Sequence, residues 1–327
     1  MARVKAKPAE ETIIETQQEK KGGGMYFASP KTDVNFIGSG CKILDMALGG
    51  GWARGRVCNI VGDKAVGKTL LAIEACANFN LSVPKGKIRY REAESAFDES
   101  YAAALGFPVD KVDRGEPIET IEDVFEDLEK VIEGAKEPEL YIIDSLDALS
   151  DRGEMQRKID EGSYGAEKAK KLSQLFRRQI RGLAEKDITL MVISQIRDNL
   201  NAGMFAKKHQ RSGGKALDFY ASQVVNLAQI EKVKKTIGGV TRVVGTWVKA
   251  SVDKNKISLP YREAIFKILF SYGVDDKEAC MEYLKDIKLN FDKAADLQTL
   301  HELVETSWFE IERRFQPETL KYGITKT

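Results

Sequence analysis

The sequence predicts an α/β protein with a mainly parallel central sheet, and three observations carry that prediction. Short strand-like runs alternate with helical segments from about residue 35 to residue 275. Two runs, 139–144 and 187–194, are almost continuously apolar, as strands buried on both faces are. A glycine-rich loop directly follows an earlier run at 56–61 and leads into a helical segment. Strands separated by helices pair in parallel through right-handed crossovers.

The expected elements follow one another along the chain. Strands are expected at 56–61, 87–92, 139–144 and 187–194, and helices at 69–79, 120–135 and 166–186. Two β-branched runs, 223–233 and 240–252, flank Gly238-Gly239 and predict a hairpin. The run 264–270 is a candidate further strand. The chain from about 275 is helical, with one helix expected over 295–315.

The pattern divides the chain into three regions. Residues 1–34 form an N-terminal segment whose first 24 residues are polar and end in three glycines, so a short helix over 8–20 and a disordered tail both fit. We expect residues 35–275 to form the core domain. Residues 276–327 are expected to form a small helical C-terminal region.

Composition bounds the function. The 327 residues include 51 basic and 50 acidic ones, so a nucleic-acid site must be a local patch rather than a property of the whole surface. Four scattered cysteines without a C-x-x-C pair, and only two histidines, lead us to expect no zinc site and no disulfide framework. Free thiols, no signal peptide and no apolar run of about 18 residues predict a cytoplasmic protein.

The strongest motif is GDKAVGKT, residues 62–69, which matches the phosphate-binding pattern G-x-x-x-x-G-K-T between a strand and a helix. Backbone N–H groups of such a loop surround phosphate oxygens, and the helix N-terminus adds favourable partial charge. We expect Lys68 to reach the β- and γ-phosphates and the Thr69 hydroxyl to help hold Mg²⁺. The nucleotide-binding residues are predicted to be Gly62, Asp63, Lys64, Ala65, Val66, Gly67, Lys68, Thr69 and Leu70.

Carboxylates follow two of the expected strands. Asp144 ends the apolar strand 139–144, where the second Mg²⁺ ligand of such a site belongs. The stretch REAESAFDESY, 91–101, holds several acidic residues after the strand 87–92. On local evidence this stretch is a solvated helix start, although a general base that activates water would need such a carboxylate.

The segment 192–222 combines cations, apolar groups and glycines after a buried strand. Cations suit phosphates and apolar groups suit stacking on bases, so contact with DNA or RNA and an ordinary surface loop both remain open. The residues concerned are Arg197, Leu200, Met204, Phe205, Lys207, Lys208, Arg211, Gly213 and Gly214. Further on, Lys254 and Lys256 share one strand face, either as a solvated strand end or as a cation pair for another subunit's phosphate.

In order along the chain, these motifs resemble the RecA family of ATP-dependent recombinases over about residues 35–275. The resemblance rests on GSGCKILDMALGGGWARGRV (38–57), the phosphate loop, EAESAFDESYAAALG (92–106), YIIDSLDAL (141–149), ISQIR (193–197), GGKALDFYAS (213–222) and the run 243–274. It implies a RecA-like ATPase core with ATP and Mg²⁺ as cofactors.

The resemblance also implies roles for single residues. Glu94 stands in the place of the family's water-activating glutamate, and Asp98 and Tyr101 stand where the family contacts the adenine. Gln195 corresponds to the γ-phosphate sensor. Lys254 and Lys256 match the pair that reaches ATP across a subunit interface, in the role of an arginine finger.

The same resemblance implies DNA loops and self-assembly. The segment 196–213 corresponds to the family's second DNA loop and 153–165 to its first, with Arg157 and Lys158 near phosphates and Tyr164 inserted between bases. The N-terminal segment would dock on a neighbouring subunit, with Met25–Phe27 as a strand. The implied partners are single-stranded DNA, homologous duplex DNA and further copies of the chain in a helical filament, with no membrane.

The sequence departs from the family pattern at Val66 and Lys215, and a divergent bacteriophage version of the family would fit these departures. The expected function is ATP-dependent homologous pairing and strand exchange, with DNA-dependent ATP hydrolysis. The alternatives are a RecA-like annealing or binding protein for single strands, a hexameric helicase-type ATPase, and a regulatory ATPase without a nucleic-acid role.

Overall fold

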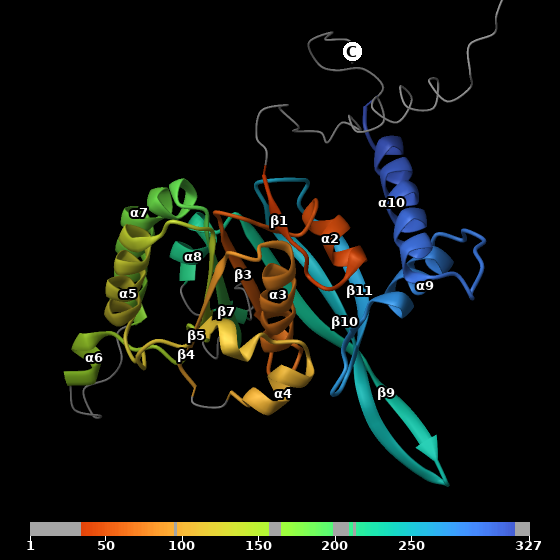
Figure 1. Ribbon diagram of the computed structural model, residues 1–327, viewed down its shortest axis with the longest axis horizontal. Helices are drawn as coiled ribbons and strands as arrows, with labels where there is room; N and C mark the ends of the chain where they lie inside the picture. The colour runs from red at the N-terminus through yellow and green to blue at the C-terminus, as the bar shows by residue number, and fades with distance from the viewer. Residues whose placement is uncertain (1–33, 95–96, 157–164, 199–208, 212–213, 318–327) are drawn as a thin grey trace, which may run out of the picture.

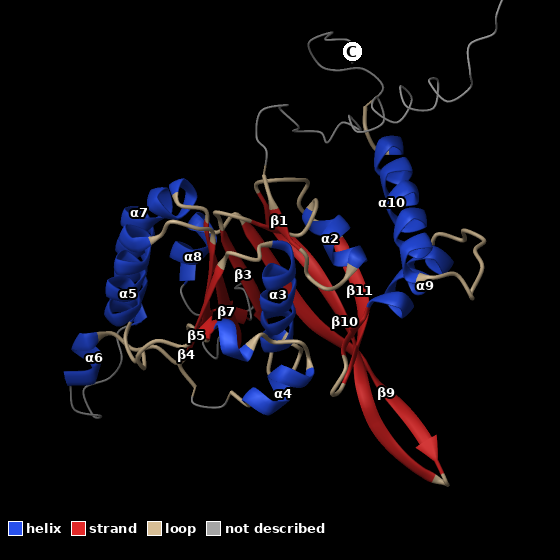
Figure 2. Cartoon of the chain, viewed as in Figure 1, coloured by secondary structure: helices blue, strands red, loops and turns tan. Residues whose placement is uncertain are grey.

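The computed structural model describes residues 34–94, 97–156, 165–198, 209–211 and 214–317. Figure 1 shows a large twisted sheet with helices on both faces and a long hairpin that projects from the body. Figure 2 separates the helical layers from the strands between them. This arrangement confirms the α/β fold with a mainly parallel central sheet.

The large sheet has the strand order β12-β11-β10-β9-β3-β7-β6-β4-β5, and β8 pairs with β7. Neighbouring strands run parallel from β9 to β5, whereas β9 to β12 are joined in antiparallel pairs. A separate pair is formed by β1 and β2. The strands are β1 Phe36–Ile37, β2 Trp52–Ala53, β3 Val57–Gly62, β4 Lys87–Glu92, β5 Val112–Asp113, β6 Glu139–Asp144, β7 Ile188–Asp198, β8 His209–Arg211, β9 Gln223–Ile237, β10 Val240–Asn255, β11 Glu263–Leu269 and β12 Gly273–Asp275.

Helices cover the two faces of the sheet and bury one apolar cluster each. The cluster on the α3 face contains Leu71 and Phe79, and the cluster on the α5 and α7 face contains Leu128 and Leu183. The helices are α2 Lys42–Leu48, α3 Lys68–Ser82, α4 Glu99–Ala104, α5 Ile121–Gly134, α6 Arg152–Gln156, α7 Gly165–Glu185, α8 Gly214–Tyr220, α9 Asp276–Asp286 and α10 Leu297–Arg314, with a 3-10 turn at Val109–Lys111.

The expected hairpin is the most extended element of the structure. Strands β9 and β10 pair in antiparallel register from Val240↔Ile237 to Asn255↔Gln223. Gly238 and Gly239 form the turn with φ angles of 56° and 78°, a backbone conformation that glycine adopts without strain. The tip of this hairpin reaches well beyond the remainder of the sheet (Figure 1).

The C-terminal helices pack on the core. Buried Cys280 and Leu284 of α9 and Leu300 and Val304 of α10 belong to the same apolar cluster as α2 and α3. The division between a core domain that ends at residue 275 and a C-terminal region that begins at residue 276 stays a prediction.

Most strands and long helices expected from the sequence are confirmed within a few residues, and β4 and β6 have the expected bounds. Strands β1, β2, β5, β8 and β12 are additions, because strands of two or three residues carry too little periodicity to be recognised. The predicted N-terminal helix and the strand Met25–Phe27 lie outside the described residues.

Candidate nucleotide site

The phosphate-loop motif joins the carboxyl end of β3 to the first turn of α3. Gly67 caps α3 with φ 94°, and a Cβ atom added there would lie 2.4 Å from Ile268 Cδ1. Only glycine fits both the backbone angle and the space, so Gly67 fixes the start of the helix. The N-terminus of α3 therefore faces the loop, in the arrangement that binds phosphate groups.

Lys68 folds back over this loop. Its Nζ donates to the carbonyl oxygens of Gly62 at 3.1 Å and Asp63 at 2.5 Å. Burial lowers the pKa of Lys68. The negative charges of Asp144 and other nearby carboxylates act in the opposite direction and only partly offset this decrease. The loop thus positions one cation at the mouth of the site, held by carbonyl oxygens that an anion can replace.

A hydroxyl and a carboxylate meet where a divalent cation would bind. Thr69 Oγ1 donates to Asp144 Oδ2 at 2.9 Å, and the Tyr90 hydroxyl donates to the same oxygen at 2.7 Å. Burial raises the pKa of Asp144; these hydrogen bonds lower it, and the charges of Glu94 and Glu92 raise it further. Clustered negative charge and hard oxygen donors are the environment that Mg²⁺ prefers, so Thr69 and Asp144 fit this ion.

Glu94 contacts one residue that follows β6 and one residue within β7. Ser145 Oγ donates to Glu94 Oε1 at 2.5 Å, and Gln195 Nε2 donates to the same oxygen at 3.0 Å. The backbone N–H of Gln195 donates to Asp147 Oδ2 at 2.6 Å, which fixes the residue within β7. A carboxylate that local sequence alone suggested to be part of a solvated helix start is therefore oriented by two neighbouring strands.

These groups line one cavity of about 500 Å³, a size typical of small-molecule sites. Asp98 lies on its wall as the N-cap of α4, accepting the Tyr101 N–H at 3.0 Å, and Tyr101 is 37% exposed. Of the predicted residues, the cavity brings together Lys64, Ala65, Val66, Gly67, Lys68, Thr69, Leu70, Glu94, Asp98, Tyr101, Asp144 and Gln195.

Sequence reasoning missed one wall of this cavity. Thr246, Ile268 and Phe270, from β10, β11 and the turn that follows β11, line it as well. Phe270 is 54% exposed, so its ring is available for stacking on a planar ligand. An aromatic residue after an antiparallel strand carries no local motif, and only the folding of the sheet places it opposite the phosphate loop.

Lys254 and Lys256 are not among the described residues that line the cavity. Lys254 Nζ donates to the carbonyl oxygens of Asp218 and, at 2.9 Å, of Phe219, and Lys256 Nζ donates to Phe219 at 3.3 Å. Both cations therefore stabilise the C-terminus of α8, where the last carbonyl groups carry partial negative charge.

The predicted nucleic-acid segments are described in part. Arg197 lies in β7 opposite Gln210 of β8, Arg211 lies opposite Ile196, and Gly214 begins α8. Arg157, Lys158, Tyr164, Leu200, Met204, Phe205, Lys207, Lys208 and Gly213 lie outside the described residues.

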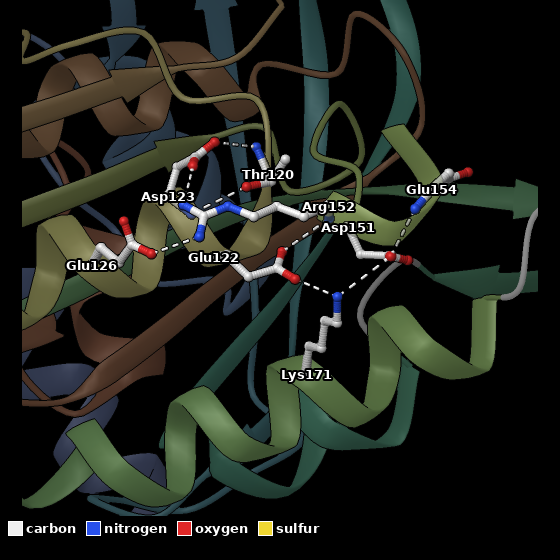
Figure 3. A network of polar contacts seen from close by, with 8 residues as sticks. All are labelled: Thr120, Glu122, Asp123, Glu126, Asp151, Arg152, Glu154 and Lys171. Carbon is white, nitrogen blue, oxygen red and sulfur yellow. Dashed lines mark hydrogen bonds and ion pairs between the residues drawn. The ribbon is translucent and has the colours of Figure 1, made fainter. Parts of the chain in front are cut away.

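A polar network fixes the start of the first of these segments. Arg152 opens α6 and donates to Asp123 Oδ1 at 2.8 Å and Glu126 Oε1 at 2.7 Å, both on α5 (Figure 3). Lys171 of α7 pairs with Glu122 and, at 3.4 Å, with Asp151. Two long helices therefore hold the backbone immediately before residue 157. The exposed Arg152 pairs contribute only about 0–1 kcal/mol each, whereas Asp151, a partner of Lys171, is buried.

The fold and cavity define an α/β protein in which a phosphate-loop motif lines a cavity at the carboxyl ends of parallel strands. The family model of the RecA N-terminal domain matches residues 10–275. The Protein RecA of Nostoc punctiforme is 34% identical over 241 residues, which are 74% of this chain and 64% of that relative. The Protein RecA of Porphyromonas gingivalis is 32% identical over 285 residues, 81% of each chain. The chain belongs to the RecA family.

The match leaves part of the relatives uncovered. The chain spans slightly less than two thirds of the Nostoc protein, and 67% of the Protein RecA of Mycobacterium ulcerans, which is 34% identical over 242 residues. In the part of the chain that is described, no helix has both the length and the apolar character needed to cross a membrane.

Proposed function

We propose that the chain is an ATP-dependent DNA recombinase that assembles as a filament on single-stranded DNA, pairs it with homologous duplex DNA and exchanges strands. Membership of the RecA family supports the class. The observation that carries the proposal is the 3.0 Å hydrogen bond from Gln195 to Glu94. It joins the carboxylate in the nucleotide cavity to β7, the strand that leads directly into the predicted DNA segment 196–213.

The phosphate loop binds the triphosphate of ATP in this proposal. Lys68 exchanges the carbonyl oxygens of Gly62 and Asp63 for β- and γ-phosphate oxygens, which adds a charge-assisted contact. Thr69 and Asp144 hold Mg²⁺, which neutralises charge on the phosphate oxygens when bound. Asp98, Tyr101 and Phe270 bind the base on the outer wall of the cavity.

Glu94 is the general base for hydrolysis. Its Oε1 accepts both hydrogen bonds, from Ser145 and Gln195, so we assign Oε2 to the attacking water. Glu94 takes the proton of that water as the water oxygen bonds to the γ-phosphorus, and the bond to the leaving ADP oxygen breaks. The side chain of Gln195 is hydrogen-bonded to Glu94, so it changes position when the γ-phosphate beside Glu94 is bound or lost. Strand β7 passes this change of position to the DNA segment.

A second subunit completes the site. Lys254 and Lys256 of a neighbouring copy reach the phosphates, so ATP links adjacent subunits and stabilises the filament. The segments 153–165 and 196–213 then bind the DNA backbone and bases, and homology is read by base pairing. The four buried, unpaired cysteines support a cytoplasmic location, in the host cytoplasm for a bacteriophage protein.

ATP hydrolysis measured with and without single-stranded DNA, at two salt concentrations, tests the proposal. We expect stimulation by DNA that declines as salt rises, since counterions are released on binding. Lys68→Ala should abolish the activity. Lys85→Ala removes an exposed lysine on the loop after α3 and should leave turnover unchanged.

Each rival function has its own outcome. Strand annealing that survives Lys68→Ala would favour an annealing protein, and closed rings with ATP-driven unwinding would favour a helicase. Turnover that ignores DNA at both salt concentrations would refute the recombinase proposal and favour a regulatory ATPase.

A further inference from the structure

Three potential metal ligands converge where the C-terminal helices meet the core. Asp276 and Cys280 lie on α9 and His301 lies on α10, and one donor atom of each lies within 4.8 Å of the other two. His301 Nε2 is 2.6 Å from Asp276 Oδ2, and Cys280 Sγ is 3.8 Å from Asp276 Oδ1. The cluster is far along the chain from the phosphate loop and uses none of the residues that line the nucleotide cavity.

The local fold explains why these side chains meet. Asp276 and Cys280 are four residues apart on α9, so they project from the same helix face. The packing of α10 against α9 brings His301 to this face (Figure 1). Nitrogen, sulfur and oxygen donors of this combination suit Zn²⁺, which binds Cys, His and Asp in tetrahedral sites.

The carboxylate of Asp276 is oriented by a third element. Its Oδ1 accepts the backbone N–H of Lys42, in the first turn of α2, at 2.7 Å. Such a hydrogen bond supports a ligating carboxylate by fixing its rotamer. The Lys42 ammonium itself is paired with Glu305 Oε2 at 2.7 Å, which offsets its repulsion of a metal cation.

The surroundings are electrostatically suited to a cation. Burial raises the pKa of Asp45 and of Glu74, and the negative charge of Asp276 adds to the rise in both. The carboxyl groups of Asp45 on α2 and Glu74 on α3 are therefore close enough to Asp276 to be affected by its negative charge. A divalent cation beside Asp276 would relieve this accumulation of negative charge.

We propose that Asp276, Cys280 and His301 form a Zn²⁺ site that fastens α9 and α10 together beside α2. His301 and Asp276 each donate an electron pair to the metal, and the proton of their 2.6 Å hydrogen bond leaves Nε2, either for Nδ1 of the same ring or for solvent. The Cys280 thiol releases its proton to solvent as the sulfur–zinc bond forms. The side chains of His301 and Asp276 are 34% and 16% exposed, so a solvent molecule takes the fourth position.

The competing description is a simple Asp276–His301 ion pair beside an inert thiol. It accounts for the 2.6 Å contact, but it predicts no affinity for metal and no role for Cys280. Cobalt separates the two descriptions, because Co²⁺ replaces Zn²⁺ in tetrahedral sites and its thiolate complexes absorb strongly.

The test is a Co²⁺ titration of the chelator-treated chain of 327 residues, followed by absorption spectroscopy. We expect one equivalent of Co²⁺ to give thiolate charge-transfer and tetrahedral ligand-field bands that Zn²⁺ abolishes by displacement. Cys280→Ser should remove the charge-transfer band. His301→Gln replaces the most exposed ligand. Loss of a hydrogen bond that only supports a ligand weakens metal binding about 10–100-fold, and we expect His301→Gln to weaken Co²⁺ binding by more than this.

A matched control is Cys58→Ser. Cys58 is also buried, but in β3, where Ala53 and Gln223 offer hydrogen-bond acceptors to a hydroxyl group. It should keep both bands. Absence of the charge-transfer band in the wild-type chain, or its persistence in Cys280→Ser, would overturn the proposal. Because the readout involves neither ATP nor DNA, its failure is distinguishable from failure of the recombinase assignment.

Discussion

Gln195 donates a hydrogen bond to Glu94 over 3.0 Å, although 101 residues separate the two along the chain. Glu94 follows β4 and Gln195 lies within β7, and these strands are separated in the sheet by β6. The contact is therefore made above the carboxyl end of β6, where Asp144 and Ser145 lie. It connects the proposed general base to β7, the strand that leads into the predicted second DNA segment.

Glu94→Gln tests the general-base role. The amide oxygen can still accept the hydrogen bonds of Ser145 and Gln195, but the group can no longer take a proton from water. We expect DNA-stimulated hydrolysis to fall about 10²–10⁴-fold, while ATP binding is retained. Phosphate release and equilibrium binding of a fluorescent ATP analogue measure the two quantities. Equal loss of binding and turnover would instead make Glu94 a binding residue.

Phe270→Ala tests the wall of the cavity that sequence reasoning missed. Stacking of an aromatic ring on a base contributes about 1–3 kcal/mol, so we expect ATP to bind about 5- to 150-fold more weakly. Tyr272→Ala is the matched control, because Tyr272 is an aromatic residue of the same turn, 66% exposed and not a cavity-lining residue. If both substitutions weakened ATP binding alike, the effect would belong to the turn and not to the Phe270 ring.

The sequence predicted the parallel half of the sheet well, because strands such as β6 are buried on both faces and read as apolar runs. Local motifs also located the phosphate loop and Asp144. The assignment of Glu94 and Gln195 needed the family resemblance, because nothing in their local sequence distinguishes them from a solvated helix start and an ordinary strand end. Glu94 and Gln195 come into contact because β4 and β7 lie on either side of β6 in the sheet.

Other features depended on contacts that no local pattern encodes. Phe270 reaches the cavity through the antiparallel strands β10 and β11. The Asp276–Cys280–His301 cluster has no recognisable metal spacing, since His301 comes from another helix, and the expectation of no zinc site rested on spacing alone. Lys254 and Lys256 contact the end of α8 within the same subunit, and these contacts also follow from tertiary packing.

Asp45 makes stability depend on pH. Burial is the main cause that raises the pKa of this carboxyl group, 3.8 in a model compound, to about 7. Between about pH 4 and pH 7 the native state therefore keeps a proton that the unfolded state has lost. The free energy of unfolding then declines as pH rises, by up to about 4 kcal/mol across this window.

Asp45→Asn removes this titration but keeps an oxygen that can accept the Ser39 N–H, which Asp45 Oδ1 accepts at 2.8 Å. Urea unfolding at pH 5 and pH 8 should show a smaller stability difference for this variant than for the wild type. Asp110→Asn, at an exposed position, should retain the wild-type difference. An unchanged difference in Asp45→Asn would assign the pH dependence to other groups.

The Lys254→Ala, Lys256→Ala double variant tests action across a subunit interface. We expect ATP binding to persist and hydrolysis to fall about 1000-fold or more, as on loss of a trans-acting cation. Losing the contacts with the end of α8 should cost only about 0.3–1 kcal/mol in stability, which thermal unfolding measures. Lys249→Ala, which alters a lysine of β10 that is paired with Glu263 at 2.7 Å, should leave hydrolysis unchanged.

Mixing two inactive variants separates the trans role from a cis structural role. The double variant retains an intact phosphate loop, and Lys68→Ala retains both distal lysines. Mixed assemblies therefore contain interfaces at which an intact loop faces intact lysines, and DNA-stimulated hydrolysis should reappear as the two are mixed in equal amounts. Hydrolysis that stays absent in every mixture, with filaments still formed, would mean that Lys254 and Lys256 act within their own subunit through α8.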